Sequence, residues 1–133
     1  MSSYVLSRIT TDGPEQFARI LATLGSDTDH RYALAELNDF LHACAPMAFG
    51  EAVAAADISA LSPYLCNYVA AMVEQAADQK HTAPPAWCAD VAPLDAPQFA
   101  VTLKSLRPHL LRSAPVAFKR RNIFVDAGVG ARV

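Results

Sequence analysis

Three consecutive cations, Lys119, Arg120 and Arg121, form the only uninterrupted basic run in the chain. They lie between Phe118 and the apolar triplet 123–125. Lysine and arginine neutralise phosphates, and they pair with carboxylates on partner proteins. Successive residues of a helix point in different directions, so three cations in a row cannot all face a core. The run therefore predicts a partner-binding surface, whose expected contact residues are Arg112, Phe118, Lys119, Arg120 and Arg121.

The charges are segregated along the sequence. Residues 1–95 contain 4 Lys and Arg against 12 Asp and Glu, whereas residues 96–133 contain 7 Lys and Arg and one Asp. Such asymmetry is typical of proteins that bind nucleic acid or a charged partner. An alternative of equal weight is that the basic segment packs on the acidic part of its own chain. The basic segment would then grip the acidic helices of its own fold, anchored by Phe118, Ile123 and Phe124.

The other residues capable of chemistry form no recognisable motif. Cys44, Cys66 and Cys88 are 22 residues apart, with no C-x-x-C or H-x-x-x-H pair, whereas zinc sites need closely spaced ligands. The four histidines have no nucleophile or acid at motif spacing, and the five glycines form no phosphate-binding loop. We therefore expect a non-enzymatic protein with no catalytic residue, no metal and no cofactor.

The start of the chain lacks the basic and apolar regions of a secretory signal, and no apolar stretch approaches the length of a bilayer span. Three cysteines, an odd number, without a signal favour reduced thiols. These features predict a cytoplasmic protein with no membrane segment.

Helices are expected to position the basic run, because apolar residues recur at three- and four-residue spacing along much of the chain. The main predicted helices cover residues 14–24, 29–45, 63–79 and 98–112. Of these, 63–79 has the clearest apolar stripe and starts with a Ser62-Pro63 cap signal. Short helices are expected within 47–56 and from Pro115 to Arg121.

The pattern predicts an all-α fold, a compact bundle of four to six helices in one domain over residues 1–133. That domain would comprise an acidic helical body (1–81), a Pro-rich loop (82–97) and a basic C-terminal part (98–133). Trp87 is expected to pin the loop to the core. Residues 123–125 are β-prone, so they could form a short terminal strand pair with an extended segment at residues 4–9 or simply lie over the core.

The C-terminal third resembles a group of small bacterial proteins. Their ends read Pro-x-Trp, then a Leu-Arg-rich helix, then Ser-Pro-x-x-Phe-basic-Arg-Arg-Asn-Ile-Phe-Val. The counterparts here are Pro85-Ala86-Trp87, Leu106-Arg107 and residues 115–125, with Ala114 inserted between the serine and the proline. Such proteins resemble antitoxin or accessory components of bacterial toxin–antitoxin modules. The resemblance implies a non-enzymatic protein that binds and neutralises or regulates a partner protein, such as a toxin encoded nearby.

Further possibilities stay open from the sequence, among them an enzyme whose site has no recognisable motif. The basic segment could make the protein a regulator that binds nucleic acid, although a pI near 6.0 is low for a dedicated nucleic-acid binder. A homo-oligomer is also compatible with the sequence.

Overall fold

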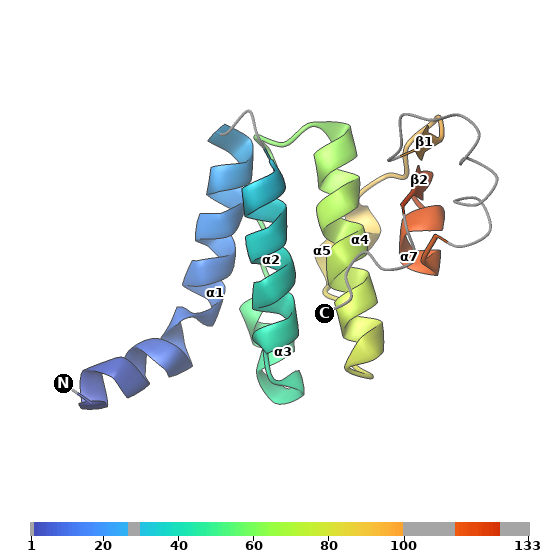
Figure 1. The fold of residues 1–133 in the computed structure, drawn as a ribbon. Helices are drawn as coiled ribbons and strands as arrows, with labels where there is room; N and C mark the ends of the chain where they lie inside the picture. The colour runs from blue at the N-terminus through green and yellow to red at the C-terminus, as the bar shows by residue number, and fades with distance from the viewer. Residues whose placement is uncertain (1, 27–29, 100–113, 126–133) are drawn as a thin grey trace.

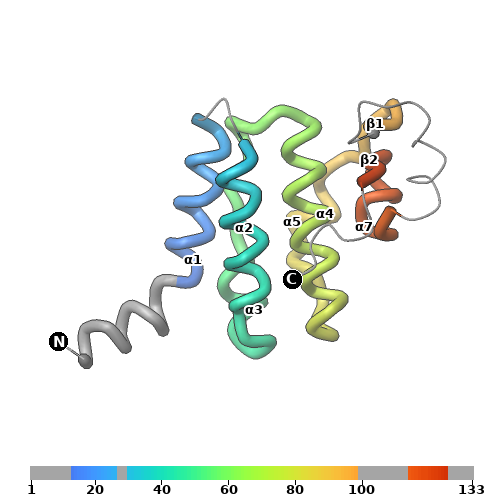
Figure 2. Tube along the Cα trace, in the orientation of Figure 1, coloured from blue at the N-terminus to red at the C-terminus, as the bar shows by residue number. Residues whose placement is uncertain are grey.

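The computed structural model of the chain describes residues 2–26, 30–99 and 114–125. Within these ranges the predicted all-α bundle is confirmed, with one pair of short strands added. The elements are α1 (Ser2–Ser26), α2 (Arg31–Ala43), α3 (Pro46–Ala52), α4 (Pro63–Gln79), α5 (Ala86–Asp90), β1 (Gln98–Phe99), α7 (Val116–Lys119) and β2 (Ile123–Phe124). Helices α1, α2 and α4 stand side by side, and α4 separates α2 from α7 (Figures 1 and 2).

Helix α4 has the bounds that the sequence predicts. The Ser62 hydroxyl accepts a hydrogen bond from the backbone N–H of Leu65 at 3.2 Å, and Pro63 occupies the first turn, where it costs no hydrogen bond. The helix ends in a reversal at His81, whose φ of 57° lies in the left-handed region. There the N–H of Thr82 bonds back to the Ala77 carbonyl at 2.9 Å. Local signals at both ends therefore set the length of this helix.

Helix α1 is longer than the sequence predicts. The expected helix start at Pro14 and the extended segment at residues 4–9 are both wrong, because the helix runs from Ser2 to Ser26 with Pro14 inside it. A proline removes one intrahelical donor, but the residues on both sides of it still take helical geometry. An alternation over so few residues could not distinguish a strand from a helix.

The core is formed where the apolar stripes of the helices meet. Phe17 of α1 stacks on Phe40 of α2, with ring centroids 6.0 Å apart. Phe49 of α3 and Val69 of α4 are completely buried in the same cluster. A Cβ at Gly25 would lie 3.0 Å from the Ala60 Cβ, so the bare backbone of that glycine allows the loop before α4 to approach α1.

The strands join two segments that are distant in the sequence. β1 and β2 are parallel, with Gln98 opposite Ile123 and Phe99 opposite Phe124. The first two residues of the β-prone triplet form a strand, but the suggested pairing with residues 4–9 is wrong because those residues are helical. The predicted helix 98–112 is also wrong at its start, where β1 lies. The remainder of that prediction falls outside the described residues.

The Pro-rich loop carries the short helix α5, which contains Trp87. Its indole N–H donates a 2.7 Å hydrogen bond to the Val53 carbonyl, and its ring lies 6.3 Å from that of Phe17. The prediction that this tryptophan pins the loop onto the core is therefore confirmed. Among the helices that the structure describes, none is both long enough and apolar enough to span a bilayer.

Candidate functional site

Four of the five predicted contact residues, Phe118 to Arg121, lie on and just after α7, a single helical turn that begins after Pro115. The backbone continues in helical geometry through Arg120, and the N–H of Arg121 donates to the Phe118 carbonyl at 3.0 Å. Asn122 then takes a φ of 63° and reverses the chain into β2. This turn sends successive side chains in different directions, so the basic run is divided between core and surface.

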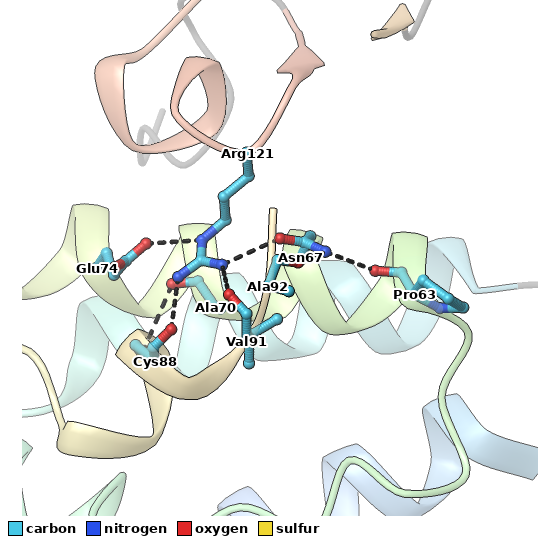
Figure 3. A network of polar contacts seen from close by, with 8 residues as sticks. All are labelled: Pro63, Asn67, Ala70, Glu74, Cys88, Val91, Ala92 and Arg121. Carbon is cyan, nitrogen blue, oxygen red and sulfur yellow. Dashed lines mark hydrogen bonds and ion pairs between the residues drawn. The ribbon is translucent and has the colours of Figure 1, made fainter. Parts of the chain in front are cut away.

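Arg121 points inward and is only 5% exposed. Its Nε donates to Glu74 Oε1 at 2.9 Å, and its Nη1 donates to Asn67 Oδ1 at 3.0 Å and to the Val91 carbonyl at 2.9 Å. Its Nη2 donates to the Cys88 carbonyl at 2.7 Å. Figure 3 shows the guanidinium enclosed by these groups. All three nitrogens of the guanidinium are therefore bonded within the chain.

The Arg121–Glu74 ion pair is desolvated on both sides, with side-chain exposures of 6% and 19%. Removing a guanidinium from water is costly unless its partners replace the lost hydration. Here a carboxylate, an amide oxygen and two backbone carbonyls do so. Loss of one partner would leave a buried charge without compensation, which is the expensive outcome for such a pair.

Asn67 connects the arginine to the loop before β1. The side chain is 1% exposed, and its Nδ2 donates to the carbonyls of Pro63 and Ala92, each at 2.9 Å. Its Oδ1 is thereby oriented to accept from Arg121. The roles of Asn67 and Glu74 were not predicted from the sequence. The available signal was their i, i+7 spacing, which places two polar side chains on one face of an otherwise apolar helix.

Asn122 completes the contact with the same loop. Its Nδ2 donates to the Leu94 carbonyl at 2.6 Å, and its own carbonyl accepts from the N–H of Gln98 at 2.8 Å. The N–H of Leu94 donates to the Arg121 carbonyl at 3.3 Å. We call Arg121 and Asn122, together with the hydrogen bonds that they make to α4, to α5 and to residues 91–98, the clasp. The clasp fixes the Pro-rich loop and the C-terminal segment onto α4.

Cys88 lies beside the clasp and is 1% exposed. Its thiol contacts the Ala70 carbonyl at 3.9 Å as a weak donor. Burial and, to a smaller extent, the neighbouring Glu74 raise the pKa of this thiol to about 12, while Arg121 acts in the opposite direction. A thiol held protonated and buried is a structural group rather than a nucleophile.

The predicted contact residues do not form one surface. Phe118 is completely buried, with its ring 5.1 Å from that of Tyr68, and Arg121 is buried in the clasp. The prediction that these two residues contact a partner is therefore corrected, because neither side chain reaches the surface. Lys119 is half-buried and Arg120 is exposed. Arg112 lies outside the described residues.

The outer face of α7 is formed by Val116 and Arg120. Val116 is 62% exposed, and the N–H of Arg120 donates to the Val116 carbonyl at 3.0 Å, so the two residues are one helical turn apart on one face. The arrangement combines an apolar side chain with a cation. This is chemistry suited to contact with a protein.

No three His, Cys, Asp or Glu side chains in the described ranges are grouped so that they could hold a metal ion. The main cluster of polar groups in the described ranges is the clasp, in which every guanidinium nitrogen of Arg121 donates to a group of the same chain. Comparison with protein-family models, with curated proteins and with solved structures gives no match to this chain.

Proposed function

We propose that the protein is a non-enzymatic, cytoplasmic bacterial interaction protein of the antitoxin type, which binds and neutralises or regulates a partner protein. The observation that supports this best is the division of the basic run. The clasp uses Arg121 internally, and the same turn leaves Val116 and Arg120 on the outside. The contact surface is the outer face of α7, with Lys119 at its border.

Residue chemistry supports a protein partner at this face. Arginine is among the residues that most often dominate binding energy, because it combines charge, several donors and a long apolar stem. Val116 adds exposed apolar area one turn away. From the sequence, Arg112 remains a predicted additional contact.

Two observations support a non-enzymatic role. The Cys88 thiol is buried, and burial raises its pKa to about 12, so this cysteine does not supply a thiolate nucleophile at neutral pH. The guanidinium of Arg121 is engaged through all three nitrogens and does not reach a substrate.

Binding of nucleic acid has less support. Affinity for a phosphate backbone rises with the number of cations that reach it. In the consecutive run only Arg120 is exposed, while Lys119 is half-buried and Arg121 is paired with Glu74.

The proposal is tested by co-expression with the product of the neighbouring gene, scoring growth and co-purification. We expect the wild-type chain to restore growth and to co-purify. Arg120→Glu should weaken the complex by about 2 kcal/mol or more, because it places a carboxylate at the centre of the contact. The matched control is Arg19→Glu, which reverses an exposed cation on α1, far along the chain from α7. This variant should bind as the wild type does.

Folding of each variant is checked by circular dichroism and urea unfolding. Growth inhibition that the wild-type chain does not relieve would contradict the antitoxin-like role. Unchanged co-purification of a folded Arg120→Glu variant would remove the α7 face as the contact surface. If the purified chain alone binds DNA or RNA with an affinity that falls steeply as salt rises, the nucleic-acid alternative would be favoured instead.

A further inference from the structure

The large apolar side chains that the described residues expose follow a pattern. Each is followed four residues later by an exposed charged residue on a helical turn, and positions i and i+4 share a face. The pairs are Tyr32 with Glu36, Met47 with Glu51, and Val116 with Arg120. Two of these pairs are acidic and the third is basic. The chain therefore displays apolar patches of opposite charge.

The outer face of α2 is the more developed acidic patch. Tyr32 is 83% exposed, and tyrosine is a residue type enriched at the centres of interfaces. Glu36 lies one turn further along, and Asp39 follows on the same side of the helix. We call Tyr32, Glu36 and Asp39 the acidic stripe. Its charge is opposite to that of Arg120 on α7, and Tyr32, like Val116, is an exposed apolar side chain.

The two patches are kept apart within one chain. Helix α4 packs against both α2 and α7 and stands between them, as Figures 1 and 2 show. Arg120 therefore cannot pair with the acidic stripe of its own chain without dismantling the α4 contacts. The same pair can meet when two copies come together.

We propose that the chain associates with itself head to tail, with α7 of one copy docking on the acidic stripe of a second copy. Val116 packs on Tyr32, and Arg120 pairs with Glu36. A head-to-tail contact is heterologous, so an open assembly keeps one unoccupied patch of each kind at its ends and can grow until a ring closes. The pairing is between exposed charges and weakens as salt rises.

This inference does not require the partner proposed above, but it uses the same α7 face. Self-association and partner binding therefore exclude each other at that face. The purified chain alone tests the self-association, whereas the co-expression experiment tests the partner. Failure of one is thus distinguishable from failure of the other.

The test is sedimentation velocity of the purified chain over a range of concentrations, in low salt and in high salt. The variants are Glu36→Arg, Arg120→Glu and the double variant carrying both changes. In a heterologous contact, residue 120 of one copy meets residue 36 of another, so the double variant restores opposite charges. The control is the double variant Glu15→Arg with Arg19→Glu, which exchanges two exposed charges on α1.

We expect concentration-dependent species larger than the 14.3 kDa monomer, which dissociate in high salt. Each single reversal should weaken association by about ten-fold or more, which corresponds to about 1.4 kcal/mol. The double variant should recover most of the wild-type association, and the α1 control should match the wild type.

A wild-type chain that stays monomeric at all concentrations in low salt overturns the inference. So does a folded double variant that associates no better than the single variants, because recovery by exchanged charges is specific to this pairing.

Discussion

Arg120 and Arg121 are neighbours in the sequence, yet the first is exposed and the second is 5% exposed. The difference arises because successive residues on a helical turn point in different directions, and only the side chain of Arg121 is directed at α4. The partners of Arg121 lie far away in the sequence, with Glu74 and Asn67 on α4. No local property of the run distinguishes the two arginines. The basic run could therefore be singled out from the sequence, but its residues could not be divided between core and surface.

Cys88 gives a prediction for the pH dependence of stability. Burial raises its pKa from 9.0 to about 12 in the folded chain, so below pH 9 both folded and unfolded chains keep the proton. As the pH rises further, the unfolded chain loses the proton first, and the free energy of unfolding falls until about pH 12. Between about pH 8 and about pH 10, Cys88 alone should cost about 1.4 kcal/mol of stability.

The measurement is urea unfolding of the wild type and of Cys88→Ala at both pH values. The variant should lose stability less steeply with pH, although its packing defect lowers stability at each pH. Part of the slope should remain, because burial also raises the pKa of Tyr68 to about 12. Equal slopes for the two proteins would contradict the assignment to Cys88.

At the scale of elements, the predictions succeeded where a local signal sets the boundary. Helix α4 has a cap, a proline in its first turn and a continuous apolar stripe, and its predicted bounds are confirmed. The β1–β2 pair could not be predicted, because two-residue strands carry no periodic pattern and their pairing joins residues 98–99 to 123–124. The full length of α1 was missed because Pro14 is an ordinary start signal that here lies inside a helix.

Helix α5 depends on one side chain for its position. Trp87 joins this short helix to the backbone at Val53 and to the ring of Phe17. Trp87→Phe keeps an aromatic ring but leaves the Val53 carbonyl without its donor. We expect the free energy of unfolding to fall by about 1–3 kcal/mol, as for a hydrogen-bond partner lost on burial.

Urea unfolding followed by far-ultraviolet circular dichroism measures this loss. Tyr32→Phe is the matched control, since it removes a hydroxyl from an aromatic residue that is 83% exposed, and it should leave stability nearly unchanged. If Trp87→Phe were as stable as that control, the indole hydrogen bond would not hold the loop.

For the molecule as a whole, the clasp explains part of the charge segregation. The acidic first part and the basic last part of the chain meet in the ion pair between Glu74 and Arg121. Arg121 thus makes the internal contact with the acidic helices that the sequence offered as an alternative. Arg120 remains on the outside, where it can serve binding. Two adjacent arginines therefore differ in role: Arg121 holds the fold together, and Arg120 is left for the contact proposed above.

Parallel urea unfolding of Arg120→Gln and Arg121→Gln tests whether Arg121 alone holds the fold, because the two variants lose the same charge one residue apart. Arg121→Gln should lose about 3–5 kcal/mol, since Glu74 is left buried without its partner. Arg120→Gln should stay within about 0.5 kcal/mol of the wild type, as exposed substitutions do. Equal losses for the two variants, or a stable Arg121→Gln, would contradict the division of the run.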